Sequence, residues 1–230
     1  AQNLKFGKPS QADWDFTAWK QTPDAEAVVL CKTMKAEYRL AGGANMYSAS
    51  SPNLSMRSQM MASSGSLSIS PDNTTMTYDV KMRLKILKDS GAGYANVDIV
   101  YFDDKNEKNS HDEFYSLKVV TFDNVNGKVK RTVVPNTAFK DERIDDHYRV
   151  RHIVVPGVKA GTIVEYQYQL FSPRYAFLYD WQLEEMIPVV YTKCEMNIPA
   201  FLNYDMQIPA DGLVKKSVMA SSVMLENVNI

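Results

Sequence analysis

Residues 140–168 bring carboxylates, arginines and two histidines together ahead of an alternating apolar run. The side chains in this stretch that could do acid–base or metal chemistry are Asp141, Glu142, Asp145, Asp146, His147 and His152. On a strand, Asp145 and His147 would share a face because side chains alternate with a period of two. Arg149 would lie beside them, and its positive charge would repel a metal ion. We therefore expect a charged turn that leads into a strand, with Asp141 and Glu142 in the turn, and no metal site.

His152 belongs to a short alternating run. It shares one face with Val150 and Val154, whereas Arg151 and Ile153 face the other way. This pattern places His152 on the more apolar face of the strand. A histidine in such a position is more often a partly buried side chain with satisfied hydrogen bonds than a catalytic base. We therefore expect no catalytic role for it.

Two cysteines, Cys31 and Cys194, are the candidate nucleophiles. A catalytic cysteine needs a histidine base and an orienting carboxylate near it. All three histidines precede Cys194, and Cys31 lies in the apolar run AVVLCKT, where burial would raise the pKa of its thiol. Cys31, His147 and Asp180 could be written as a triad, but their spacing does not support one. In an exported chain the cysteines could form a disulfide, although two free, buried cysteines are the plainer interpretation. The sequence also lacks the G-x-S-x-G motif of serine hydrolases.

The bulk composition argues against two classes of protein. The 230 residues carry 26 basic and 27 acidic side chains, a net charge of −1, unlike the basic surface of a nucleic-acid-binding protein. No apolar run approaches the roughly 18 residues that a membrane-spanning helix needs. The chain begins with AQN, as it would after removal of a signal peptide or in a cloned fragment. Export is therefore the expectation.

The N-terminal segment, residues 1–21, predicts a short helix. Ser10 is a candidate N-cap and Asp13 sits three residues later, an arrangement related to the capping box. The expected helix covers residues 11–20 and ends ahead of a proline. One of its two tryptophans would dock it on a sheet.

The rest of the chain is dominated by alternating apolar residues. In residues 80–86 the apolar side chains face one way and Lys or Arg the other, and residues 163–170 repeat the pattern with an outward face that starts at Glu165. An Asn-Gly pair at 126–127 is a strong hairpin signal. About ten short strands divided by Gly, Pro and Asn turns predict an all-β, mainly antiparallel, two-layer β-sandwich domain over residues 22–230.

Two loops are rich in side chains that could hold an ion. Residues 41–75 are dominated by Ser, Ala, Asn and Met and form the expected loop insertion. Its methionines could hold copper(I), although a loop that packs its methionines on the domain is far commoner. Residues 103–113, DDKNEKNSHDE, loosely resemble a calcium loop, and a solvated charged loop is the default. We therefore expect neither a metal nor a cofactor.

Several stretches occur in an order typical of one family: PDAEAVVL, KMRLKIL, GYANVDIVY, NGKVKRTVVPNTAFKDERIDDHYRVRHIVVPGVKAGTIVEYQYQLFSP and DWQLEEMIPVVYTKCEMNIPAFLNY. Through them the chain resembles, over about residues 22–210, the domain of unknown function numbered 3857. The most specific matches are VPGVKAGTIVEYQY and DWQLEEMIPV. In many exported bacterial proteins, that domain precedes a transglutaminase-like, papain-related domain.

The resemblance implies a non-catalytic accessory module of an exported transglutaminase- or protease-like protein, in the periplasm or at the cell surface of a Gram-negative bacterium. The transglutaminase-like domain is absent from this sequence, so we do not expect the chain to be an enzyme. It would bind or position its own catalytic domain, a partner protein or a polymer substrate. The alternative is a stand-alone surface protein that binds glycan or peptide.

Exposed aromatic side chains beside arginine are typical contact residues in binding sites. The candidate binding residues are Trp181, Arg174 and Tyr175, together with Asp145, His147 and Arg149. For Trp181, a role in covering the core is the favoured alternative.

Overall fold

The structure is a computed structural model that describes residues 4–40, 74–107, 111–174, 178–182, 185–197, 214–219 and 222–228. The expected loop at 41–75 lies outside the described residues, except for its last two positions, which open strand β2. Tyr175 also lies outside them.

The described residues form one α-helix, two short 3₁₀ helices and eleven strands. Their bounds are α1 Gln11–Asp15, β1 Ala27–Leu40, β2 Thr74–Ile86, a 3₁₀ helix Asp89–Ala95, β3 Val97–Phe102, β4 Glu113–Val125, β5 Lys128–Val133, a 3₁₀ helix Asn136–Ala138, β6 Phe139–Arg143, β7 Tyr148–Ile153, β8 Ile163–Ser172, β9 Tyr191–Asn197, β10 Val214–Met219 and β11 Ser222–Val228.

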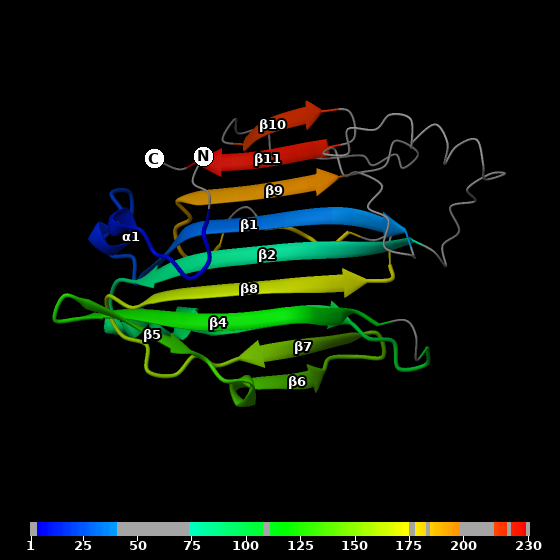
Figure 1. Cartoon of the computed structure of the whole chain (residues 1–230), viewed down its shortest axis with the longest axis horizontal. Helices are drawn as coiled ribbons and strands as arrows, with labels where there is room; N and C mark the ends of the chain where they lie inside the picture. Colours follow the sequence, from blue (N-terminus) through cyan, green and yellow to red (C-terminus); the bar gives the residue numbers. More distant parts are fainter. Residues whose placement is uncertain are drawn as a thin grey trace.

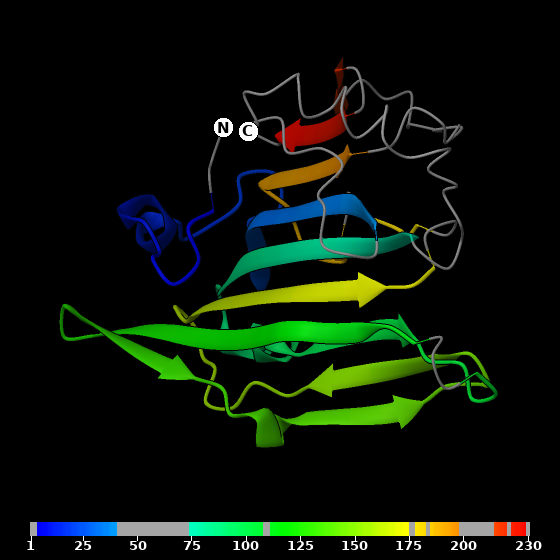
Figure 2. The ribbon, with the colours of Figure 1, turned by 45° about the vertical axis from the view of Figure 1, so that its right-hand side comes forward.

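The strands build two sheets. The larger has the order β10-β11-β9-β1-β2-β8-β4-β5 and the smaller has the order β3-β7-β6. Among these strands, every pair is antiparallel except β1 with β9. The smaller sheet packs on one face of the larger at its β4 side, with β7 and β6 beyond β4 in the views of Figures 1 and 2. The prediction of an all-β, mainly antiparallel two-layer sandwich with a short helix is confirmed.

The main core lies between the two sheets. The larger sheet contributes buried side chains such as Leu84 and Val164, and the smaller contributes Ile99 and Ile153. These are the apolar sides of alternating strands, because side chains on a strand point to opposite faces in turn. The part of the larger sheet near β1 and β9 is covered instead by residues around Trp181, which packs on a cluster that includes Cys194 of β9.

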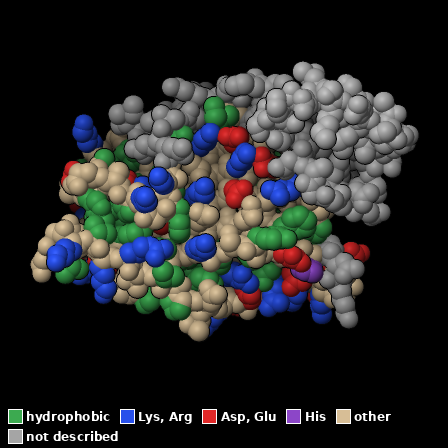
Figure 3. All heavy atoms as spheres, in the orientation of Figure 1, with side chains coloured by type: hydrophobic (Ala, Val, Ile, Leu, Met, Phe, Trp, Pro, Cys, Tyr) green, Lys and Arg blue, Asp and Glu red, His purple; other side chains and the backbone are tan. Residues whose placement is uncertain are grey.

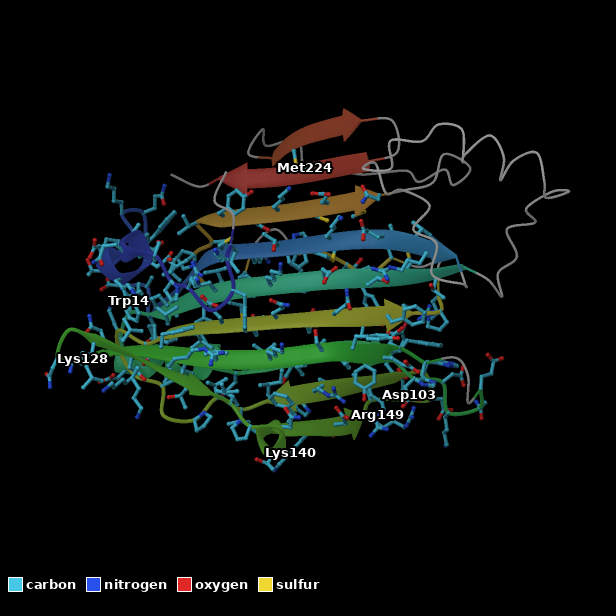
Figure 4. The ribbon with its side chains drawn as sticks, in the orientation of Figure 1. Trp14, Asp103, Lys128, Lys140, Arg149 and Met224 are labelled. Carbon is cyan, nitrogen blue, oxygen red and sulfur yellow. The ribbon has the colours of Figure 1, made fainter. Side chains whose placement is uncertain are left out.

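The β4–β5 hairpin forms as the Asn-Gly pair predicts. Asn126 and Gly127 both have positive φ, 53° and 78°, which a type I′ turn requires at its two central positions. The Gly127 N–H also donates to the Asn124 side chain at 3.0 Å. The hairpin projects from the left of the molecule, where Figure 4 labels Lys128.

Helix α1 is shorter than predicted. Ser10 and Asp13 form the reciprocal capping box that the sequence indicated, but the helix ends at Asp15 instead of residue 20. Phe16 already has an extended backbone, and its ring stacks on Trp19 with the ring centroids 6.0 Å apart. The aromatic contact therefore replaces residues 16–20 of the expected helix.

The N-terminal segment covers one end of the outer face of the larger sheet, the face turned away from the smaller sheet (Figure 2). Phe6 and Trp14 pack there on Val120, Phe122 and Ile163, so Trp14 is a tryptophan that docks the segment. Figure 3 shows this face, where Lys and Arg side chains lie among Asp and Glu. None of the described helices has the length and apolarity to cross a membrane.

Candidate functional site

The charged stretch ahead of β7 is a strand followed by a turn. Asp141 and Glu142 lie on β6, so the prediction that they lie in the turn is wrong. The turn is held by Asp145, whose Oδ1 accepts hydrogen bonds from the backbone N–H groups of His147 and Tyr148 at 2.7 and 2.8 Å. The Asp145 carboxylate therefore stabilises the backbone between β6 and β7.

His147 and Arg149 each contact an aspartate that follows β3. The His147 Nδ1 lies 3.1 Å from Asp104 Oδ2, and Arg149 Nη1 donates to Asp103 Oδ2 over 3.4 Å. Figure 4 shows Asp103 and Arg149 at the same end of the smaller sheet. Asp145, His147 and Arg149 thus each contact a different partner. Within the described ranges, no group of three or more His, Cys, Asp or Glu residues could hold a metal ion.

His152 lies on the outer face of the smaller sheet and not on the side of the core, but it is partly buried and hydrogen-bonded as expected. Its Nδ1 lies 2.7 Å from Asp98 and its Nε2 3.4 Å from Glu142. The hydrogen bond to Asp98 raises the pKa of His152 above its usual value. Arg151 and Ile153 form the inward face instead, because the Arg151 guanidinium can stack on aromatic rings between the sheets.

Both cysteines are free and buried. Burial raises the pKa of Cys31 to about 12 and that of Cys194 to about 12. Cys31 packs with Leu4 and Tyr191 under the N-terminal segment, and Cys194 lies in the core that Trp181 covers. The two thiols therefore act as small hydrophobic side chains.

Trp181 and Arg174, two of the candidate binding residues, lie in different environments. Trp181 donates its Nε1–H to Thr192 at 3.2 Å, and the buried Lys32 ammonium lies 5.0 Å from its ring centroid. Arg174 lies over the Phe102 ring, 4.0 Å from its centroid. Trp181 thus packs with the core cluster, whereas Arg174 packs beside the end of β3.

A buried charge cluster holds the N-terminal segment on the sheet, and no pattern in the sequence predicts it. Glu165 lies on the outer face, as predicted, but its side chain is 0% exposed. Its Oε1 accepts a hydrogen bond from Arg83 Nε at 2.7 Å, and Arg83 Nη1 donates to Asp13 at 2.8 Å. Lys85 donates to the backbone carbonyls of Asp13 and Trp14 at 3.0 and 2.5 Å. The ion pair and hydrogen bonds of this cluster thus hold the N-terminal segment on the outer face of the larger sheet.

Among the described residues, a space that could hold a ligand lies between β4 and the smaller sheet. It consists of two hollows, of about 800 Å³ and about 430 Å³. The larger hollow is lined by Tyr101, Asp103, Asp104, Lys105, His111, Asp112, Glu113, Phe114, Arg143 and Arg151. The smaller hollow is lined by Phe114, Tyr115, Ser116, Leu117, Asn136, Phe139, Asp141 and Arg151. Because Phe114 and Arg151 belong to both, we treat the two hollows as one feature, the inter-sheet groove.

Arg151 is the central side chain of the inter-sheet groove. Its guanidinium lies 4.4 Å from the centroid of Phe114 and 5.7 Å from that of Tyr101. Its Nε and Nη2 donate to the two carboxylate oxygens of Asp141 at 2.6 and 2.7 Å, and this pairing lowers the pKa of Asp141. Arg151 is therefore held in a fixed position. The alternation of β7 indicates the inward position of Arg151, because it places Arg151 on the same face as the core residue Ile153.

Asp112 is a buried carboxyl group in the wall of the larger hollow. Its Oδ2 accepts hydrogen bonds from the Phe102 N–H at 2.8 Å and from the Tyr179 hydroxyl. Burial has the largest effect and raises the pKa of Asp112, although these hydrogen bonds act in the opposite direction. The protonated form of this carboxyl is thus favoured by the fold.

We expect folding stability to depend on pH through Asp112. Its pKa in the folded chain lies above the usual 3.8, so the folded state binds this proton more tightly than the unfolded state does. Its contribution to stability is therefore greatest at low pH and is lost as the pH rises through the folded pKa. Asp112→Asn, which does not titrate, should lack this component. Urea midpoints of both proteins measured across this range should diverge, and a constant difference would contradict the assignment.

Comparison with solved structures finds matches to parts of larger proteins. A "putative protease" from Parabacteroides distasonis matches 89% of this chain with 36% of its own, at 14% identity and a TM-score of 0.51. A "putative nutrient binding protein" from Legionella pneumophila matches 89% of this chain with 63% of its own, at 9% identity and a TM-score of 0.38. The match to yeast LTA4 hydrolase in complex with bestatin covers 98% of this chain and 29% of that protein, at 8% identity and a TM-score of 0.34. The chain thus spans about a third of the length of the first of these proteins.

Comparison with curated protein sequences found no match. Residues 72–220, however, match the family described as "Domain of Unknown Function with solved-structure structure" (DUF3857). The matched range covers well over half of the chain and contains every residue that lines the inter-sheet groove. The chain belongs to the DUF3857 family.

Proposed function

We propose that this chain is a non-catalytic accessory module of an exported transglutaminase- or protease-like protein, and that it binds a polypeptide in the inter-sheet groove. The groove is the observation that carries the proposal. It combines aromatic side chains, a fixed arginine and carboxylates in hollows of about 800 and 430 Å³, a mixture that suits polypeptide side chains. The bound polypeptide would belong to the module's own catalytic domain, to a partner protein or to a polymer substrate.

The placement of the reactive groups favours binding over catalysis. Both thiols are packed among apolar side chains, where the protonated form is favoured. His147 and His152 each contact a carboxylate on the smaller sheet or its loops, Asp104 and Asp98 respectively. A nucleophile needs an activating base within hydrogen-bond reach, but the charged neighbours that shift the pKa values of the two thiols are Arg83, Asp13 and Glu195, and none of them is a histidine.

The family supports the accessory and exported parts of the proposal. Domains that resemble this one precede a transglutaminase-like domain in many exported bacterial proteins, and on this basis we propose that the chain acts in the periplasm or at the surface of a Gram-negative cell. The similar region also makes up only 36% of the Parabacteroides protein, so that protein has room for further domains.

The purified chain should neither hydrolyse amide bonds nor cross-link proteins. The thiols have a pKa raised to about 12, so little thiolate is present at neutral pH. In an assay that couples a labelled amine to casein, we expect the wild type to match a no-protein blank. Ellman's reagent should modify either thiol only after unfolding. Cross-linking that is abolished in Cys31→Ala and retained in Cys194→Ala would refute the non-catalytic role.

The accessory context can be tested at the gene. Sequencing the DNA on both sides of the segment that encodes residues 1–230 should reveal an open frame that continues into a transglutaminase-like domain with its Cys, His and Asp residues. A frame without such a domain would contradict the accessory role. It would favour a stand-alone surface protein that binds glycan or peptide.

A further inference from the structure

The first part of β4 is paired on one side only. Strand β8 pairs with β4 from its start, whereas β5 pairs with it only from Val120 onward. One further bond joins the Val134 N–H to the Val119 carbonyl at 2.9 Å, and the chain then departs at Pro135 into the 3₁₀ helix before β6. Among the described residues, none pairs with Glu113–Lys118 on this side. This segment is thus an open sheet edge.

The open edge presents main-chain hydrogen-bonding groups. In an antiparallel strand, the N–H and C=O groups of one residue point to the same neighbouring strand, and successive residues point to opposite neighbours. Val119 bonds on the β5 side, so Leu117 also directs its N–H and C=O to that side, while Lys118 faces β8. An extended polypeptide supplies the complementary acceptor and donor.

The inter-sheet groove follows this same edge. The smaller hollow is bounded by β4 residues that include Phe114 and Leu117, and by Phe139 of β6. On the β4 side, the larger hollow is bounded by Glu113 and Phe114. Alternate side chains of a strand added to β4 would point toward the smaller sheet, and the two hollows provide the volume for them.

The larger hollow has carboxylates that lack a strong cationic partner. Asp104 lies 3.1 Å from His147 and Glu113 lies 3.3 Å from His111. Among the described ion pairs, neither carboxylate has a lysine or arginine partner, so each can accept a cationic side chain of a ligand. By contrast, Arg143 compensates Asp103 at 2.9 Å. A lysine or arginine of a ligand would compensate the remaining charge.

We propose that the open edge of β4, Glu113–Lys118, binds an extended polypeptide segment as an added strand. An apolar side chain of that segment occupies the smaller hollow and a lysine or arginine occupies the larger one. The proposal rests on the proposed function and specifies how its polypeptide is recognised. It assigns the specificity of the module to the groove and the affinity to main-chain hydrogen bonds.

Two other interpretations of the edge lead to different outcomes. The register of β4 shifts between Phe114 and Ser116, and Tyr115 at the shift is 71% exposed. Bulges and charged residues at an edge also prevent unwanted strand pairing, and an edge protected in this way would bind no peptide. Alternatively, the edges of two copies of this chain could pair with each other, which would make the chain a dimer.

The test uses a random-sequence linear peptide library displayed on phage and selected on the full chain. A selected peptide is synthesised in three forms: unmodified, and N-methylated at either alternating set of residues. Strand addition predicts that one methylated form binds at least about tenfold more weakly, while the other binds like the unmodified peptide. The Leu117 amide should become protected from hydrogen exchange when the peptide binds.

Charge variants test the chemistry of the larger hollow. Glu113→Lys should weaken binding of a selected Lys- or Arg-containing peptide about tenfold or more. Glu142→Lys, on the outer face of β6, is the matched control and should leave binding unchanged.

No selected peptide, or equal binding of both methylated forms, would overturn the proposal. So would protection of Leu117 in a dimer without peptide. If the peptide protects amides elsewhere on the chain, strand addition is wrong while the accessory function stands. Cross-linking activity of the purified chain would instead refute the proposed non-catalytic accessory function.

Discussion

We expect Glu165→Ala to lower the free energy of unfolding by about 3–5 kcal/mol, because it leaves a buried arginine without its main partner. The Arg83 side chain is only 7% exposed and bonds Glu165 at 2.7 Å and Asp13 at 2.8 Å. The Gly7 N–H would also lose its acceptor, the second oxygen of Glu165. Urea unfolding followed by circular dichroism measures the change.

The matched control is Gln167→Ala, the next residue on the same face of β8. Gln167 is half-buried and lies outside the charge cluster, so its truncation should change stability by no more than about 0.5 kcal/mol. The double variant Arg83→Met with Glu165→Leu removes both charges of this pair but leaves the buried Asp13 carboxylate without its arginine, so it should recover only part of the loss. Equal losses for Glu165→Ala and Gln167→Ala would contradict the role given to the cluster.

Gly91→Ala should lower the free energy of unfolding by about 1–3 kcal/mol through overpacking. A Cβ on Gly91 would lie 2.3 Å from the backbone oxygen of Glu26. That oxygen accepts hydrogen bonds from the N–H groups of Leu87 and Lys88 at 2.8 and 3.0 Å. It cannot retreat without weakening both bonds, which hold the end of β2 to the segment before β1. Thermal and urea unfolding should both show the loss.

Gly93→Ala provides the comparison within the same 3₁₀ helix. A Cβ on Gly93 meets nothing within 4 Å, and its φ lies outside the left-handed region. This variant should change stability by no more than about 0.5 kcal/mol. A loss as large as that of Gly91→Ala would show that the effect comes from helix propensity and not from the contact with Glu26.

The elements of the fold could be predicted where the signal was local. The positive φ values of Asn126 and Gly127 follow from residue type, because few other pairs adopt that turn without strain. The capping box of Ser10 and Asp13 is equally local. The length of α1 could not be predicted from local sequence, because the helix ends where the Phe16 ring stacks on Trp19.

Alternation identified the two faces of each strand but not which face would be buried. Glu165 was assigned correctly to the face away from the smaller sheet, yet that face is covered at this point by the N-terminal segment. On β7, the apolar neighbours of His152 suggested the inner face, whereas Arg151 occupies it. An arginine can be buried when it is paired and stacked, and such partners come from other strands.

The candidate site could not be predicted because it is formed by a gap in strand pairing. Asp145, His147 and Arg149 are close in sequence but contact different partners. The inter-sheet groove exists because β5 leaves β4 at Val120, and nothing in the alternation of β4 marks that point. Phe114 and Arg151 then meet across the groove although they are far apart in sequence.

The most direct test of the central claim, an open polypeptide-binding edge on β4, is amide hydrogen exchange of the free chain measured residue by residue by NMR. Lys118 and Val120 bond to β8 and should exchange slowly, whereas Leu117 faces the open side and should exchange orders of magnitude faster. The account predicts this alternation. A Leu117 amide as protected as its two neighbours would show that the edge is already covered, and would contradict the account.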